Sequence, residues 1–200
     1  MRITDDRYTQ ERKQLDLALR LLRHEARSST IRYCTGISED RIRKLYKAYL
    51  EGQTTQPLRR KRGKSPQELT AFLRNPQAHL EASLLAGILC TLKLIEPAMP
   101  RSDWRPSLAF AERCCDAFEY YRQMVAEARF AFEHAWFLML SLARADELKL
   151  VECARCHAPV LQDQCAALLR ACPFCDAKPP RPGIRKPGGQ SVAERPKSLR

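Results

Sequence analysis

The stretch CARCHAPVLQDQCAALLRACPFC, residues 153–175, holds five cysteines in 23 residues. Four of them form two pairs, Cys153 with Cys156 and Cys172 with Cys175. This spacing is typical of two zinc knuckles, because a two-residue gap lets both thiolates of a pair reach one ion. Four thiolates complete a tetrahedron and leave no open coordination position. The stretch therefore predicts one structural Zn²⁺ per chain, held in a small zinc-ribbon-like module.

Three other interpretations of the cysteines are weaker. A disulfide framework is disfavoured because the cysteines number nine and the N-terminus lacks the apolar segment of an export signal, so we expect a reducing, cytoplasmic compartment. A dithiol redox centre is suggested by Cys172-Pro173-Phe174-Cys175, but this motif does not open a helix in a βαβ unit. A zinc deaminase needs His-x-Glu followed by Pro-Cys-x-x-Cys, and only the first half is present, at His79 and Glu81.

The predicted module also contains residues that are not needed as ligands. Cys165 has no partner at two-residue spacing, and we expect it to be partly buried. His157 follows the first pair and would replace a thiolate only in a distorted knuckle. Three bases would offset the negative charge of the tetrathiolate and present positive charge to an outside anion: Arg155, Arg170 and Lys178.

The net charge of +12 is concentrated in two segments, residues 59–64 and 178–200, which together carry 11 of the 12 charges. A near-neutral body with two cationic segments is the distribution expected of a protein that meets a polyanion. Two solvated basic loops are the alternative. Because the basic runs accompany a metal module, we favour nucleic acid as the partner. The bases of the first run are Arg59, Arg60, Lys61, Arg62 and Lys64.

Apolar residues recur at helical spacing through most of the chain up to residue 145, so the predicted fold class is mostly α. In the long helix expected from Pro76 to near Glu96, the predicted spine is Leu80, Leu84, Ile88, Leu92 and Ile95. Two more helices are expected over about residues 106–125 and 128–145. From residue 148 onward, short apolar runs that include Val160-Leu161 and Leu168-Leu169 predict small strands. No apolar run is long enough to span a bilayer.

Residues 15–50 have the order of a helix-turn-helix: a helix over about residues 10–26, a short helix capped by Ser28 or Ser29, a Thr35-Gly36 turn, and a basic helix capped by Ser38. An ordinary helical hairpin whose bases face water fits the same pattern. Two acids in the first turn of the last helix, Glu39 and Asp40, count against direct base reading because they repel phosphate. The candidate DNA contacts on this helix are Arg41, Arg43, Lys44 and Lys47.

Three regions are therefore expected. A helical domain covers residues 1–146 and contains the helix-turn-helix-like segment, a four-cysteine zinc module covers residues 147–178, and a basic tail covers residues 179–200. The Pro, Gly and charge content of the tail predicts disorder. No nucleophile–base pair, phosphate-binding glycine loop or carboxylate constellation stands out in the sequence, so we expect no enzymatic activity.

The sequence resembles the FlhC family, the zinc-containing subunit of the bacterial flagellar master transcriptional activator. The resemblance covers roughly residues 15–175. It rests on LDLALRLLRHEARSSTIRYCTGISEDRIRKLYKAY at residues 15–49, on Ala135-Trp136 leading through residues 147–150 into the first cysteine pair, and on the four-cysteine pattern. The family has a proline-rich loop and an aromatic-containing stretch after the Lys-Leu-Tyr-Lys segment, where this chain has the basic run 59–64.

The resemblance implies zinc held by the four paired cysteines. It also implies a hetero-oligomer, a heterohexamer in the family, with the small helical partner FlhD, and activation of flagellar operons through promoter DNA and RNA polymerase. We therefore expect a non-enzymatic, cytoplasmic, DNA-binding activator subunit with no membrane contact. The alternative from another class is a zinc-containing adaptor that binds only protein.

Overall fold

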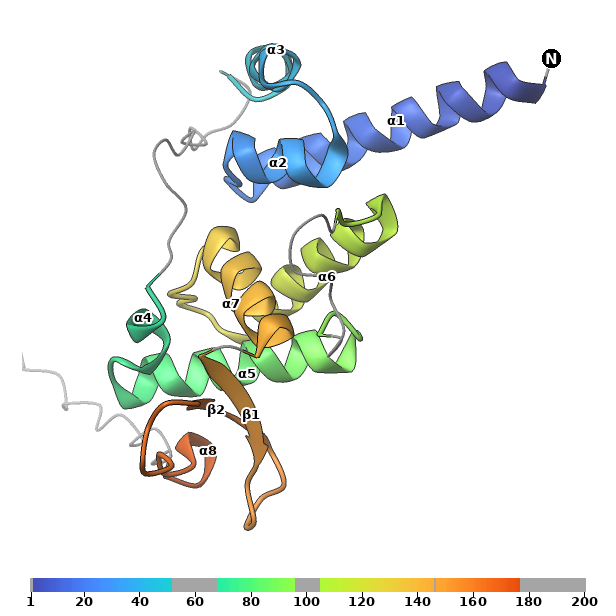
Figure 1. Ribbon diagram of the computed structural model, residues 1–200. Helices are drawn as coiled ribbons and strands as arrows, with labels where there is room; N and C mark the ends of the chain where they lie inside the picture. The colour runs from blue at the N-terminus through green and yellow to red at the C-terminus, as the bar shows by residue number, and fades with distance from the viewer. Residues whose placement is uncertain (1, 52–67, 96–104, 146, 177–200) are drawn as a thin grey trace, which may run out of the picture.

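A computed structural model describes residues 2–51, 68–95, 105–145 and 147–176 of the chain. Within these ranges it contains eight helices and one two-stranded sheet (Figure 1), which confirms the prediction of a mostly helical protein. The basic run 59–64, Lys178 and the tail 179–200 lie outside the described residues. None of the described helices is both long and apolar enough to cross a membrane.

Three helices pack against one another at the N-terminal end: α1 (Arg2–Arg23), α2 (Ser28–Thr35) and α3 (Glu39–Tyr49). Their shared core includes the fully buried side chains of Leu21, Ile31 and Ile42. Helix α1 begins earlier and ends earlier than the sequence predicts. It ends before Glu25, whose backbone takes the left-handed φ of 56°.

The turn between α2 and α3 follows the prediction. Gly36 adopts a φ of 74°, which glycine accepts without strain, and its amide bonds the carbonyl of Arg32 to close the helix. The Ser38 hydroxyl accepts from the amide of Arg41 at 3.5 Å and caps α3. Three residues, 36–38, therefore join the two helices.

The N-terminus of α2 is capped differently from the prediction. Its N-cap residue is Arg27, which makes no side-chain cap hydrogen bond, so the expected cap by Ser28 or Ser29 is wrong. Glu133, a buried residue of α7 (Phe132–Arg144), instead accepts from the amide of Arg27 at 2.8 Å and from the hydroxyl of Thr30 at 3.0 Å. A carboxylate from a distant helix thus accepts the hydrogen bonds of the first turn of α2, where the macrodipole favours negative charge.

Helix α5 (Pro76–Thr91) lies at the centre of the body and contacts α4 (Thr70–Leu73), α6 (Leu108–Met124) and α7 (Figure 1). The Asn75 side chain caps it by accepting from the amide of Ala78 at 2.8 Å. The helix ends at Thr91, earlier than expected, and the predicted spine is only half-buried. The buried apolar face is instead Ala78, Ala82, Leu85, Ala86 and Leu89. Helix α5 therefore carries apolar residues on two faces, and the body covers one of them.

The predicted strands around Leu150 and Val160 form an antiparallel hairpin, β1 (Leu148–Glu152) and β2 (Pro159–Asp163), with Leu150 opposite Leu161. Strand β2 packs on α5, and Leu148 and Leu161 join the same buried cluster as the helices. A Cβ at Gly87 of α5 would lie 3.1 Å from Pro159 Cγ, so glycine permits this close approach. The strand expected at Leu168-Leu169 is wrong. These residues lie in a loop and their exposed fractions are 84% and 59%.

Candidate metal centre

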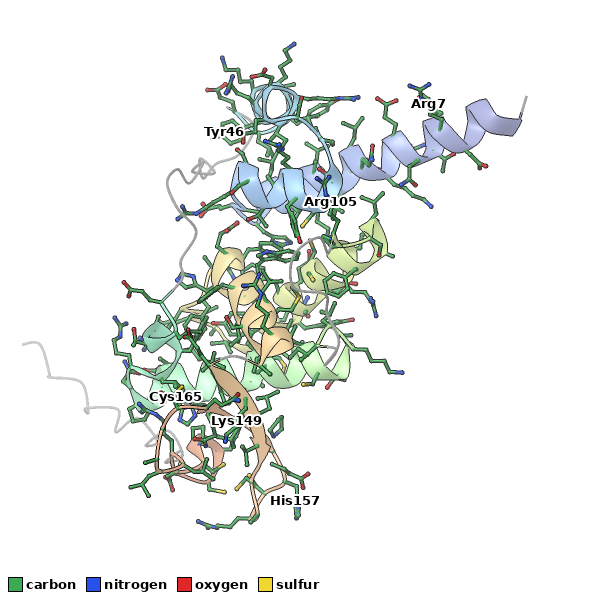
Figure 2. The ribbon with its side chains drawn as sticks, in the orientation of Figure 1. Arg7, Tyr46, Arg105, Lys149, His157 and Cys165 are labelled. Carbon is green, nitrogen blue, oxygen red and sulfur yellow. The ribbon has the colours of Figure 1, made fainter. Side chains whose placement is uncertain are left out.

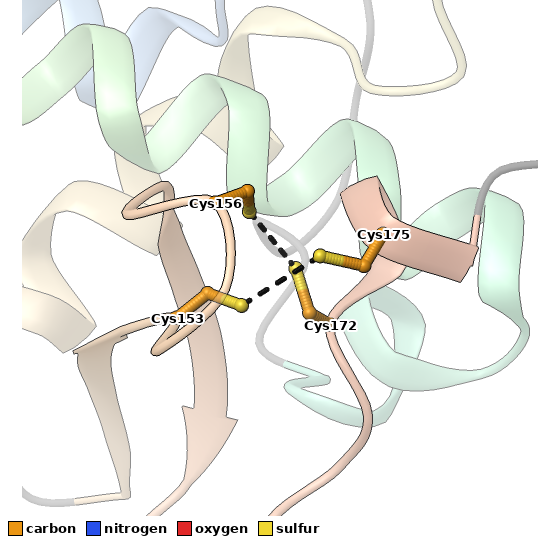
Figure 3. Close-up of side chains that lie close together, drawn as sticks. All are labelled: Cys153, Cys156, Cys172 and Cys175. Atoms are coloured by element: carbon orange, nitrogen blue, oxygen red, sulfur yellow. Dashed lines mark hydrogen bonds between the residues drawn. The ribbon is translucent and has the colours of Figure 1, made fainter.

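The two cysteine pairs meet at one point, between the β1–β2 turn and the short helix α8 (Pro173–Asp176) (Figure 3). The four Sγ atoms all lie within 4.8 Å of one another. The Cys153–Cys175 and Cys156–Cys172 sulfur separations are 3.8 Å and 3.6 Å. A tetrahedron with metal–sulfur bonds of about 2.3 Å has edges of about 3.8 Å, so the arrangement fits a tetrathiolate zinc ion. The same separations are far too long for disulfides.

The backbone of the hairpin turn brings Cys153 and Cys156 to the centre. Cys153 bonds Ala158 through its amide at 3.0 Å, and its carbonyl accepts from the amide of His157 at 2.9 Å. His157 takes the left-handed φ of 58°, which closes the turn after Cys156. On the opposite side, the amide of Asp176 bonds the carbonyl of Cys172 at 3.1 Å and shapes the second pair into one helical turn.

The Cys153 sulfur lies where negative charge is favoured, whereas the surroundings of Cys175 disfavour a second charge. Backbone amides of Cys156 and Arg155 donate toward the Cys153 sulfur and lower the pKa of its thiol to about 6. The neighbouring Cys156 and Cys153 sulfurs raise the pKa of Cys175. Four thiolates in contact require a cation to offset their repulsion, and a bound metal ion would supply it.

The two spare ligand types of the sequence stay outside the cluster. Cys165 is exposed, which corrects the expectation of partial burial, and it lies on the loop beside α4 and α5 (Figure 2). His157 lies at the far tip of the hairpin, where its Nδ1 is 2.7 Å from a carboxylate oxygen of Glu152 (Figure 2). Neither residue belongs to the group of four sulfur atoms.

The four candidate DNA contacts on α3 divide into two kinds. Arg41 pairs with Glu11 of α1 at 2.6 Å, and Arg43 pairs with Asp40 at 2.8 Å. Lys44 and Lys47 are exposed and make no ion pair within the described part of the chain. The free positive charge of this helix therefore comes from the two lysines.

The candidate contacts near the metal centre lie at the other end of the molecule from α3 (Figure 1). Arg155 and Arg170 are both exposed. The backbone of Arg170 is held at both of its polar groups, because its amide donates to Oε1 of Gln162 at 2.8 Å and its carbonyl accepts from Nε2 at 3.0 Å. The described candidate DNA contacts therefore lie on two separate surfaces, one on α3 and one beside the cysteines.

Sequence reasoning missed Gln162, a buried polar residue of β2 that holds the backbone of Arg170. Strand alternation gave no sign of it, because Val160, Leu161 and Gln162 are consecutive and all buried. It also missed Arg74, between α4 and α5, which lines two clefts together with Arg170. In the sequence, Arg74 is marked only by its position directly before Asn75, the residue that caps α5.

No protein-family model matches the chain. No curated protein sequence matches it either.

Proposed function

We propose that the chain is a DNA-binding transcriptional activator subunit, acting on flagellar operons together with a FlhD-like helical partner. In this proposal it is cytoplasmic and non-enzymatic, its partner assembly is a heterohexamer, and it recruits RNA polymerase. One described feature carries the proposal, namely the α2–turn–α3 arrangement with the free lysines of α3 on its outer side.

The arrangement of α2 and α3 supports a helix-turn-helix-like function. In Figure 1 the axis of α3 points nearly along the view, whereas α2 lies close to the plane, so the two helices cross steeply. Helix-turn-helix modules join two helices at a steep angle by a turn of three or four residues, as residues 36–38 do here. The exposed lysines would then meet phosphates of the duplex.

The acids that counted against DNA binding are paired in the structure. Asp40 lies 2.8 Å from Arg43, and Glu39 lies 4.0 Å from Arg32. Each acid therefore has an arginine beside it, which reduces its repulsion of a phosphate. Exposed pairs of this kind contribute little to stability, so their role in the proposal is this screening of the two acids.

In the proposal, Cys153, Cys156, Cys172 and Cys175 hold one Zn²⁺ as a structural, zinc-ribbon-like centre. Closed coordination leaves the metal no position for substrate, so its contribution is to fix the hairpin against α8 and position Arg155 and Arg170. The basic run 59–64 and Lys178 are further proposed contacts. These residues lie outside the described part of the chain.

A protein-interaction adaptor is the second candidate, and the uncharged outer face of α5 favours it. A gel shift with a flagellar promoter fragment separates the two functions when it is run with the full chain alone and with a FlhD-like partner. The activator predicts a shifted complex that includes the chain. Absence of any shift in both lanes would contradict DNA binding and leave the adaptor.

A further inference from the structure

Helix α5 is unusual in lacking charge on its outer side. Its only charged residue is Glu81, which is buried and accepts hydrogen bonds from Tyr121 and Arg129. A helix that is apolar all round is normally buried on all sides in its working assembly. In the described structure the side of α5 that carries Leu84 and Ile88 is left half-exposed.

This side of α5 forms one wall of a groove. The α5–α6 groove has a volume of about 490 Å³ and runs between Leu84 and Ile88 of α5 and Tyr120 and Met124 of α6. Phe174 of the metal module lines it as well. Tyr120 is 52% exposed and Met124 is 64% exposed. Exposed tyrosine and methionine on one surface are typical of protein interfaces.

The spacing of the walls suits a helix. Leu84 and Ile88 are four residues apart, as are Tyr120 and Met124, so each helix presents an apolar ridge with a trough between. Hydrogen bonds hold the two ridges antiparallel at both ends, from Arg113 to the carbonyl of Leu92 and from Tyr121 to Glu81. A third helix with an apolar stripe fits into such a trough.

The charged residues around the groove indicate which kind of helix would bind in it. Among the described residues, no acidic or basic side chain lines the groove. At the end formed by the C-terminus of α5, Nη1 of Arg113 lies 3.3 Å from the carbonyl of Leu92, and the next residue, Lys93, is exposed. The acids on α6 that face α1, Asp116 and Glu119, are paired with Arg20. The groove therefore favours an occupant with an uncharged stripe and an acidic residue at this end.

A second copy of the chain is a poor source of that helix. Apart from the groove itself, the large exposed apolar side chains of the described residues are single tyrosines on different helices and the loop pair Leu168 and Leu169. None of these forms a stripe along a helix.

We propose that the α5–α6 groove binds an amphipathic helix of a partner protein, with an uncharged apolar stripe in the trough and an acidic residue against Arg113 and Lys93. This inference deepens the partner-binding part of the proposed function and rests on it. It does not depend on whether the chain binds DNA.

The test uses the full chain and fluorescent, helix-stapled peptides about four turns long. They carry leucine at every third or fourth position on one face, and glutamates at one end or the other. We expect saturable binding of one of the two orientations by fluorescence anisotropy. Met124→Glu should weaken it by about tenfold or more, whereas the matched control Leu168→Glu, at an exposed residue outside the groove, should leave it unchanged. Because Met124 is exposed, its replacement should leave the fold intact.

Arg113→Glu tests the orientation. It should weaken binding of the glutamate-ended peptide and strengthen binding of the same peptide ended in lysine. Failure of the unmodified chain to bind either peptide, or equal binding by Met124→Glu, would overturn the proposal. So would a dimer in sedimentation that Met124→Glu dissociates, because the groove would then be filled by a second copy.

A labelled promoter duplex, titrated in parallel into the same chain both alone and with the FlhD-like partner, keeps the two proposals distinguishable. Peptide binding without duplex binding would refute the DNA-binding function alone. Duplex binding without peptide binding would refute the groove alone.

Discussion

The hydroxyl of Ser83 accepts a hydrogen bond from the backbone amide of Leu161 at 3.1 Å. One helical turn earlier, Nε2 of His79 lies 2.7 Å from the carbonyl of the same residue. Two side chains of α5 therefore satisfy both polar backbone groups of a buried position on the outer edge of β2. Helix α5 thus bonds the edge of β2 where a third strand would otherwise pair. These bonds join the cysteine hairpin to the helical body.

Replacing Ser83 with alanine should destabilise the protein. The amide of Leu161 would remain buried without an acceptor, which costs about 1–3 kcal/mol. Urea denaturation followed by circular dichroism measures the change. Ser29→Ala, at an exposed helical serine, is the matched control and should change the free energy of unfolding by no more than about 0.5 kcal/mol. Equal effects of the two substitutions would contradict the role assigned to Ser83.

Stability should fall as the pH falls below about 6.5. Burial lowers the pKa of both His24 and His79 below 6.5. Below pH 6.5 the unfolded chain therefore binds more protons than the folded chain, and stability declines until the folded pKa values are reached. The pKa of Glu119 is lowered from 4.5, chiefly by its hydrogen bond with Arg20. Its contribution to the free energy of unfolding is therefore lost only at lower pH.

The measurement compares the free energy of unfolding at about pH 7.5 and about pH 5.5. Replacing both histidines with glutamine should flatten the difference, because the glutamine amide keeps a donor without titrating. An unchanged pH dependence in the double variant would show that other groups cause it.

Removing one cysteine of the cluster should release the metal. Elemental analysis of the purified chain should give one zinc per chain, and Cys153→Ser or Cys172→Ser should reduce it strongly because three thiolates no longer close the site. Cys165→Ser is the control and should retain full zinc, since Cys165 lies outside the four-sulfur group. Protein that contains no zinc before any substitution would contradict the proposed zinc centre.

The sequence predicts local features well where local rules decide them. Gly36 and Ser38 take their expected positions at helix ends, and α5 begins at Pro76 as expected, because a left-handed turn, a cap or a helix start depends on a few neighbouring residues. The cysteine spacing likewise predicted which four sulfur atoms come together.

Features that depend on distant residues were not predictable in the same way. The cap of α2 comes from Glu133, more than one hundred residues away along the chain. The apolar pattern of α5 is continuous around the helix, so spacing alone could not tell which face the body would cover. The composition of Leu168-Leu169 resembles that of a strand. Strand β2, however, already forms hydrogen bonds with β1 on one side and with α5 on the other.

If α3 binds DNA through Lys44 and Lys47, these two lysines should account for part of the salt dependence of binding. Affinity of the full chain with its partner for a promoter duplex is measured between about 50 and 200 mM salt, and the slope of log affinity against log salt is compared among variants. Lys13→Ala with Lys149→Ala is the control, because both lysines are exposed and lie off α3 and outside the α5–α6 groove.

Lys44→Ala with Lys47→Ala should weaken binding and reduce the steepness of the slope by about two, because each lost phosphate contact removes about 0.9. The control pair should leave the slope unchanged. A slope in the α3 variant equal to that of the unmodified chain would contradict the claim.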